Sequence, residues 1–301
     1  MIKQGSVTEP LRLERSAYAM GATFSVVLYG HDPLVMEEAV AMAFDELRRL
    51  DELLSDRRPA SEWSLVNRHA AQRPVKVSQE LFWLLSECLE YSRQSEGAFD
   101  ISVGPLIKAW GFFNDAGRLP GEEELAAARN RVGYRHILLD PAAQTVMFDL
   151  PGMEISPGGI GKGYAVDRMV ELLKQRDLDT ALVAGSGSSI CGLGVPPGES
   201  RGWPVQIRNP AKPREAAAEV FLNNLSISTS GSYEKCFWAK GRLYSHLIDP
   251  RTGYPTQGAA SVSVIAPRAL DSEAWAKACF LNKNRGRPRC FPVFGTPKSW
   301  V

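Results

Sequence analysis

The sequence predicts an α+β fold, with mixed sheets and packed helices. Helical and strand-like segments come in mixed order, without the strict strand–helix alternation of a doubly wound sheet. The composition is that of an ordinary globular protein, since 44% of the 301 residues are hydrophobic and 23% are charged. This length suits one large domain, which we place at residues 1–281, followed by an irregular basic tail at 282–301.

The first half of the chain shows clear helical periodicity. A short strand is expected over Phe24–Leu28, followed by a turn. From Leu34 to Ser55 the apolar residues recur at helical spacing and predict a long amphipathic helix. A second helix is expected around Leu81–Leu89, with Ser78 as its N-cap. Two strands around a turn at Asp140-Pro141 are predicted over Tyr134–Leu139 and Thr145–Phe148.

The second half mixes short strands with two helices. A helix is predicted after Gly163, and another over Ser272–Phe280. Further strands are expected over Thr180–Ala184, Val205–Ile207, Ala218–Leu222, Leu225–Ile227 and Ser261–Ile265. Four cations with Gly and Pro follow the last helix and indicate a solvated tail.

Charge and hydropathy exclude several classes of protein. The formal net charge of +1 argues against a dedicated nucleic-acid binder, which would carry a strong basic excess. No apolar run approaches the ~18–20 residues that a membrane span requires. The first 18 residues lack the apolar core of a secretory signal, so we expect a cytoplasmic protein. Five scattered cysteines without a CxxC pair suggest neither a zinc ribbon nor a disulfide framework.

A glycine-rich stretch, Gly158–Gly163, precedes a predicted helix. It is not a P-loop, because Ser156 stands in place of the first Gly and Gly163 in place of the Ser or Thr that meets Mg²⁺. Consecutive glycines still allow a ligand to approach the backbone, and the following helix presents free N–H groups. Lys162 adds a full charge. The stretch therefore predicts an anion site, most simply for phosphate, with plain turn glycines as the alternative.

A second polar cluster lies between residues 229 and 253. Thr229, Ser230 and Ser232 surround a glycine, and His246 precedes an Asp-Pro turn. His246 suits a general base because imidazole titrates near neutrality. Taken alone, a single histidine in a polar strand is more often structural than catalytic.

Several segments resemble blocks of the ApbE family. They occur in the family's order and cover roughly residues 18–281. The blocks are Met20–Thr23, Gly97–Leu106 with Trp110–Phe112, Gly158–Asp167, Ser228–Tyr233 and Ser245–Pro250.

The resemblance implies an FAD:protein FMN transferase. Members of this family use Mg²⁺, cleave the pyrophosphate of FAD and attach FMN through a phosphoester to a Thr or Ser of a target flavoprotein, while AMP leaves. His246 would then be the base at the acceptor hydroxyl, and Lys162 would stabilise charge on the phosphoryl oxygens. Arg57 falls where the family often has an aromatic ring, and it could stack on the ligand in its place. The implied contacts to FAD are Met20, Arg57, Ala98, Phe99, Asp100, Ser156, Lys162 and Leu247.

The metal positions depart from the family pattern. The family holds its metal with a backbone carbonyl at the position of Gly159, and with an Asp and a Thr four residues apart on a helix. Here these two are Glu273 and Lys277. A protonated lysine cannot ligate and repels Mg²⁺, so we expect a weakened Mg²⁺ site in which Lys277 takes over part of the metal's electrostatic role. The alternative is that Lys277 points into solvent. Ser156 also stands where members commonly have a carboxylate.

Two classes of function follow from these observations. The favoured one is flavin transfer to a Thr or Ser of an acceptor flavoprotein. The alternative, which the altered metal pair keeps open, is a non-catalytic flavin-nucleotide-binding protein or an FAD pyrophosphatase. Retention of His246 favours the first and Lys277 the second.

Overall fold

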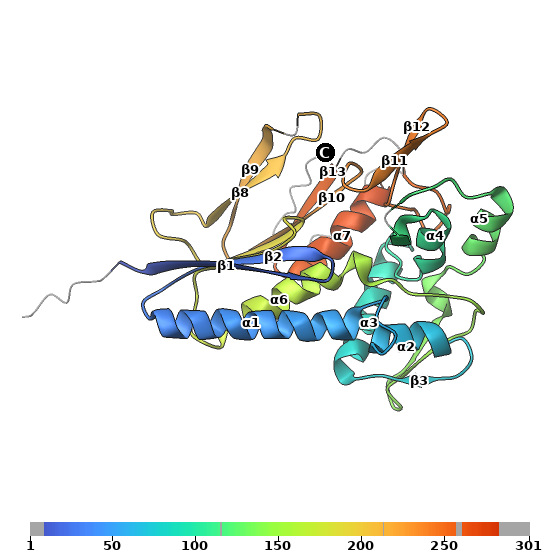
Figure 1. Ribbon diagram of the computed structural model, residues 1–301, viewed down its shortest axis with the longest axis horizontal. Helices are drawn as coiled ribbons and strands as arrows, with labels where there is room; N and C mark the ends of the chain where they lie inside the picture. The colour runs from blue at the N-terminus through green and yellow to red at the C-terminus, as the bar shows by residue number, and fades with distance from the viewer. Residues whose placement is uncertain (1–8, 115, 213, 257–260, 283–301) are drawn as a thin grey trace, which may run out of the picture.

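A six-stranded antiparallel sheet forms the centre of the computed structural model (Figure 1), which describes residues 9–114, 116–212, 214–256 and 261–282. The strand order is β1-β2-β6-β7-β10-β13. The strands span Leu11–Ala19 (β1), Ala22–Gly30 (β2), Ala181–Gly185 (β6), Ser189–Leu193 (β7), Leu225–Gly231 (β10) and Ser261–Ala266 (β13).

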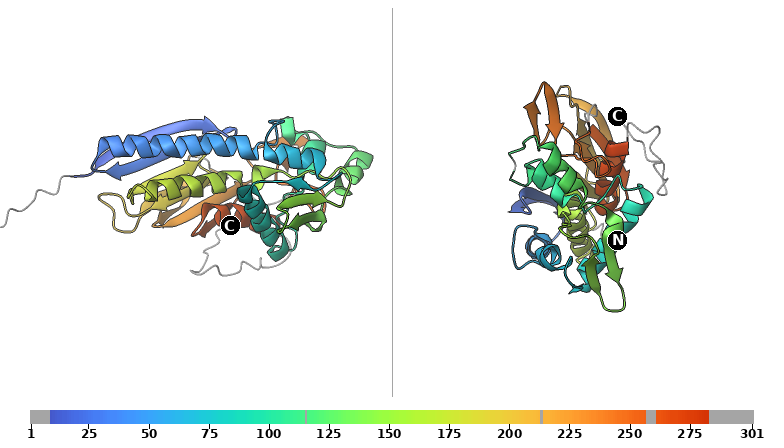
Figure 2. Two further views of the ribbon diagram at one scale, coloured as in Figure 1. Left: turned by 90° about the horizontal axis from the view of Figure 1, so that it is seen from below. Right: turned by 90° about the vertical axis from the view of Figure 1, so that its right-hand side faces the viewer.

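Three helices pack against the sheet: α1 (Pro33–Leu54), α6 (Gly161–Lys174) and α7 (Ala269–Asn282). Figure 2 shows α1 and α6 running beside each other along the length of the molecule. Asp32 caps α1, because its carboxylate accepts the backbone N–H groups of Leu34 and Val35. The helix α7 contacts β10, β13 and α6, so it is buried on most sides. Polar residues on α7 must therefore find partners inside the protein.

The hairpin β8 (Trp203–Arg208) and β9 (Ala216–Leu222) packs on the sheet through a separate apolar cluster. The inward residues Trp203, Val205 and Ile207 of β8 contribute to this cluster together with Ile227 of β10. These alternate residues share one face of a strand, as a half-buried hairpin requires.

A second group of elements covers one end of the sheet (Figure 1). The hairpin β11–β12 joins α4 through a small aromatic core, in which Trp110 stacks on Tyr244 with ring centroids 5.2 Å apart. This packing fixes the end of β12, directly before His246. The elements are α2 (Glu62–His69), β3 (Val75–Lys76), α3 (Gln79–Gln94), α4 (Gly104–Ala109), α5 (Glu122–Arg129), β4 (Ile137–Asp140), β5 (Thr145–Phe148), β11 (Cys236–Ala239), β12 (Arg242–Ser245) and the 3₁₀ turns η1 (Phe112–Asn114), η2 (Tyr134–His136) and η3 (Pro157–Gly159).

The structure confirms the α+β class and most of the predicted elements. The long helix and the Ser78 cap are as expected, since Ser78 Oγ accepts the N–H of Leu81 at 3.2 Å. None of the described helices is long and apolar enough to cross a membrane. Cys88, Cys191 and Cys236 are free thiols.

Three element predictions were wrong at their boundaries. Tyr134–His136 is a 3₁₀ turn, closed by a hydrogen bond from His136 N–H to the Gly133 carbonyl, and the strand begins only at Ile137. The helix α6 begins at Gly161, within the glycine stretch. β10 continues through Gly231, so part of the polar cluster is strand. Of the tail predicted at 282–301, Asn282 ends α7, and the remainder lies outside the described residues.

Candidate functional site

A cleft of about 550 Å³ lies between one end of the sheet and the second group of elements. It gathers segments far apart in the chain: the β1–β2 turn, the residues after α1, the α3–α4 loop, η3 with the start of α6, the residues before β11, the loop that begins at His246 after β12, and α7. Except for Glu273, which lies just below its surface, every residue that the family resemblance implied for the site lines this cleft. These are Met20, Arg57, Ala98, Phe99, Asp100, Ser156, Gly159, Lys162, His246, Leu247 and Lys277.

Met20 occupies a two-residue hairpin turn with Gly21. Both residues have positive φ angles, 53° and 70°, as a type I′ turn requires. The backbone N–H of Met20 donates to Asp51 Oδ1 at 3.0 Å, which holds this unusual conformation. The Met20 side chain reaches the start of α6, where a Cβ added to Gly161 would lie 3.0 Å from Met20 Cε. Gly161 therefore leaves room for a flexible apolar wall of the cleft.

His246 follows β12 and is held from two sides. Its backbone N–H and its ring Nδ1 both contact the Lys235 carbonyl, at 2.9 and 3.2 Å, and the ring meets Phe112 edge to face. A carbonyl only accepts hydrogen bonds, so Nδ1 carries the proton and Nε2 has a free lone pair. Burial and the neighbouring ammonium groups, of which Lys277 is the strongest, lower the pKa of His246 to about 4. The ring is therefore neutral at physiological pH and able to accept a proton.

A buried carboxylate, Glu273, forms the charged floor of the cleft. Its Oε1 lies 3.3 Å from Lys162 Nζ and 3.2 Å from Lys277 Nζ, and its Oε2 accepts the N–H of Gly163 at 2.6 Å. Burial alone would raise its pKa, but Lys277, Lys162 and the Gly163 N–H together lower the pKa of Glu273 to about 2. Glu273 is therefore an anion with both oxygens bound.

The glycine stretch differs in one respect from its predicted role as an anion site. The N–H of Gly163, in the first turn of α6, has no partner within the helix, but it donates to Glu273. This donor is therefore not available to a ligand. Gly158, Gly159 and Lys162 still face the cleft. Positive charge toward a ligand in this part of the cleft therefore comes from side chains rather than from the Gly163 amide.

The three family metal positions meet in space. A Cβ added to Gly159 would lie 3.5 Å from Lys277 Cδ and 3.1 Å from the Phe99 ring. Lys277 thus passes beside Gly159 and bends back to Glu273, one helical turn before it on α7. This arrangement excludes the alternative that Lys277 points into solvent.

Arg57 lines the cleft and stacks on protein rather than standing free. Its guanidinium carbon lies 4.9 Å from the centroid of the Phe113 ring, and it donates to the Phe113 carbonyl. Sequence reasoning missed Phe113 and also Asp56, whose pKa burial raises. Phe113 directly follows Phe112, the last residue of a resemblance block, and this position next to the block could have pointed to Phe113.

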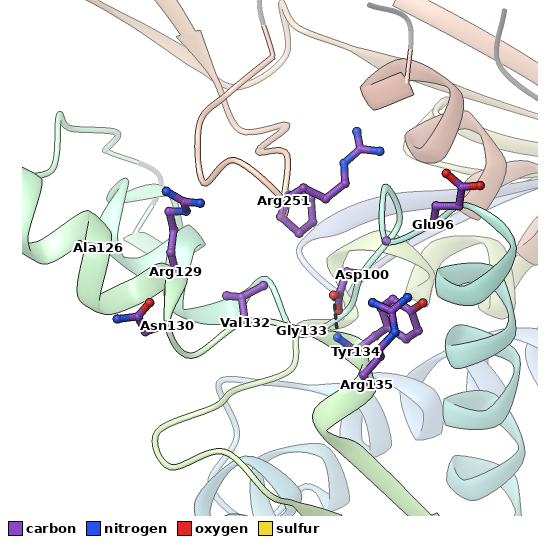
Figure 3. A pocket seen from close by; sticks show the side chains of 12 residues that line it. Glu96, Asp100, Ala126, Arg129, Asn130, Val132, Gly133, Tyr134, Arg135 and Arg251 are labelled. Atoms are coloured by element: carbon purple, nitrogen blue, oxygen red, sulfur yellow. Dashed lines mark hydrogen bonds between the residues drawn. The ribbon is translucent and has the colours of Figure 1, made fainter. Parts of the chain in front are cut away.

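Asp100 separates this cleft from a second hollow of about 370 Å³ (Figure 3). Its Oδ1 accepts from the N–H and Oγ of Ser102, and its Oδ2 accepts the N–H of Tyr134 at 2.8 Å. With both carboxylate oxygens engaged, Asp100 holds two loops together beneath the cleft. Arg129, Arg135 and Arg251 give the second hollow its positive charge.

Of the predicted hydroxyl cluster, Thr229 and Ser230 are successive residues of β10 and so lie on opposite faces of the sheet, with the neighbouring Ser228 on the same face as Ser230. Ser228 Oγ is bonded to Ser189 and Ser272 in the interior, whereas Thr229 Oγ1 pairs with Ser263. Ser188, Ser230 and Gly231 line the small polar extension of the cleft beside Glu273. The outer end of β10 thus contributes to the site, while the inner hydroxyls stabilise the sheet against α7.

The sequence matches the profile of the ApbE family over residues 20–289, nine-tenths of the chain. The chain belongs to the ApbE family. A relative from Treponema pallidum, named FAD:protein FMN transferase, is 33% identical over 282 residues, which cover 89% of this chain and 78% of the relative. One of the same name from Klebsiella pneumoniae is 30% identical, covering 88% of this chain and 81% of the relative.

Solved ApbE structures share this fold. The ApbE protein of Thermotoga maritima superposes with a TM-score of 0.85 at 28% identity, covering 92% of this chain and 88% of its own. The flavinyl transferase ApbE of Pseudomonas stutzeri, in its apo form, gives a TM-score of 0.82 at 27% identity, covering 94% and 91%. The resemblance drawn from the sequence blocks is therefore confirmed at the level of family and fold.

Proposed function

We propose that this chain is an FAD:protein FMN transferase, as its ApbE relatives are named. The observation that carries the proposal is His246, which lines a cleft that also presents Lys162 and Lys277, and whose Nδ1 donates to the Lys235 carbonyl and so leaves Nε2 as the proton acceptor. Transfer of a phosphoryl group to a hydroxyl needs a base at the acceptor and positive charge at the phosphoryl oxygens. Both are in one cleft.

The bonds made and broken follow from this arrangement. The hydroxyl oxygen of an acceptor Thr or Ser attacks the phosphorus that bears riboflavin, and its proton passes to His246 Nε2. The bond from that phosphorus to the bridging oxygen breaks, and AMP leaves with that oxygen. Lys162 and Lys277 offset the charge that develops on the phosphoryl and leaving oxygens. FMN is then joined to the acceptor through a phosphoester.

The cleft also offers surfaces for the rest of FAD. Met20, Phe99 and Leu247 form apolar walls, and Arg57 on Phe113 provides a flat cationic surface. Flat rings favour such surfaces, because aromatic and cationic groups interact with their faces. We assign the isoalloxazine and adenine rings to these two regions, in either order.

The residues at the family metal positions do not fit Mg²⁺ well. Mg²⁺ requires oxygen ligands in near-ideal octahedral geometry at about 2.0–2.1 Å. Glu273 already has ammonium groups at Oε1 and an N–H at Oε2, and Lys277 offers no lone pair while protonated. We therefore assign no step of the reaction to a metal.

Incubation with FAD and an acceptor flavoprotein domain, followed by in-gel flavin fluorescence after denaturation, tests the proposal. We expect fluorescence on the acceptor with the wild-type protein and none when the acceptor Thr is changed to Val. Release of FMN and AMP without labelled acceptor would instead identify a pyrophosphatase, and binding of FAD without either product would identify a carrier.

A further inference from the structure

The cluster of Lys162, Glu273 and Lys277 places a fixed positive charge where relatives are expected to hold a divalent cation. Glu273 is 3% exposed, whereas the two lysine side chains are 25% and 20% exposed and line the cleft. The carboxylate is thus the internal anchor, and the two ammonium groups are the surface that a ligand meets.

The cluster is assembled from two helices that pack on each other. Lys162 comes from the first turn of α6 and Lys277 from the middle of α7, one helical turn after Glu273. Both ammonium groups share Glu273 Oε1, while Oε2 is bound to the Gly163 amide. The cluster therefore holds two cations against one anion, and one positive charge is left uncompensated within it.

A hard cation would have to displace this arrangement. To reach Glu273 Oε1 it would have to enter between two ammonium groups that lie 3.2 and 3.3 Å from that oxygen. The metal cation would then lie within a few ångströms of both ammonium groups, and like charges that close repel strongly where water is partly excluded. Among the described residues, no group of three or more His, Cys, Asp or Glu side chains offers another ligand set.

An ammonium group can serve a diphosphate in place of a metal. Lysine is a common phosphate ligand, because its charge and three N–H donors meet several phosphate oxygens. We propose that Lys277, with Lys162, replaces the divalent cation in this protein, so that it binds the diphosphate of FAD and transfers FMN without Mg²⁺. The part concerning FMN transfer rests on the function proposed above, whereas the part concerning binding does not.

Metal binding is measured directly by electron paramagnetic resonance with Mn²⁺ as the probe, in the presence of FAD. We expect the wild-type protein to bind no Mn²⁺ beyond what FAD alone binds. The variant Lys277→Thr, alone and combined with Glu273→Asp to restore the family pair, is expected to gain a bound Mn²⁺. Tight binding of one Mn²⁺ by the wild-type protein, equal to that of the double variant, would overturn the proposal.

FAD affinity supplies a second readout that does not depend on catalysis. Flavin fluorescence titration should give the same wild-type Kd with EDTA as with Mg²⁺. Lys277→Met should raise the Kd by about ten- to a hundredfold, the range of a charged hydrogen bond to phosphate. Lys174→Met, an exposed lysine at the end of α6, is the matched control and should leave the Kd unchanged. Lys277→Gln, which keeps an N–H donor for Glu273, replaces Lys277→Met if loss of that hydrogen bond prevents folding. A large loss of FAD binding in EDTA would contradict the proposal.

The two proposals can fail separately. If FAD binds equally with and without metal but no acceptor is labelled under any condition, the transferase function fails and the replacement of the metal stands. If the acceptor is labelled only when Mg²⁺ is added, the function stands and the replacement fails.

Discussion

Replacing Gly163 with alanine tests how closely α6 and α7 must approach to assemble the charged floor of the cleft. An added Cβ would lie 2.7 Å from the Ala269 carbonyl carbon and 3.0 Å from Glu273 Oε2. Because the first of these atoms is backbone, it cannot rotate away, and the two helices must separate. Glu273 would move with α7, away from the Gly163 amide that binds it.

The expected magnitude combines two opposing effects. Overpacking of a closed interface costs about 1–3 kcal/mol, while alanine in place of glycine within a helix contributes up to ~1 kcal/mol in the other direction. We expect a net loss of about 1–2 kcal/mol in the free energy of unfolding. The Kd for FAD should rise by about tenfold, which corresponds to a loss of ~1.4 kcal/mol in binding free energy, because the lysines would no longer be aligned with the diphosphate.

Thermal denaturation and FAD titration measure both effects. Each kcal/mol should lower the Tm by about 2–4 °C. Gly121→Ala is the control, because a Cβ there would meet no atom within 4 Å and Gly121 does not line the cleft. If Gly163→Ala melted and bound FAD like Gly121→Ala, the inferred role of this helix contact would be refuted.

Three further predictions concern individual side chains. His246 must be unprotonated to act as a base, and its pKa is lowered to about 4. We therefore expect kcat/KM to stay constant as the pH falls through 6.5 and to decline only near pH 4. A half-maximal kcat/KM near pH 6.5 would contradict this. Arg57→Ala should weaken FAD binding, whereas Arg57→Tyr should keep most of it, and equal losses in the two titrations would argue against stacking. Asp100→Asn should lower the free energy of unfolding by about 1–3 kcal/mol, because an amide nitrogen cannot accept the Tyr134 N–H. Its Kd for FAD should change little, and the reverse outcome would make Asp100 a ligand contact.

The parts of the fold with strong local signals could be predicted from the sequence. The apolar stripe of α1 and the Ser78 cap are encoded within one turn or a few turns of chain. The strand β1 could not be predicted, because its side chains are mostly exposed and its extended conformation is stabilised by backbone pairing with β2. The extension of β10 was hidden because its small polar residues find partners across the sheet, as Thr229 does with Ser263.

The site shows the same division. The sequence was enough to nominate eleven residues that line the cleft, but it missed others, among them Asp56, Phe113, Ser188 and Glu234. The partners of Glu273 could not be predicted from the sequence, because Gly163 lies 110 residues earlier in the chain and only the packing of α6 on α7 brings the two residues together. The blocked Gly163 amide was therefore predicted as open to an anion.

The most direct test of the account is the intact mass of an acceptor flavoprotein domain over time with FAD and this protein, for the wild type and for His246→Ala. We predict that the wild type adds one FMN phosphoester to the acceptor with an equal amount of AMP released. The His246→Ala variant should still bind FAD but label the acceptor about 10²–10⁴-fold more slowly, the usual contribution of a general base. Labelling by the variant at the wild-type rate would contradict the account.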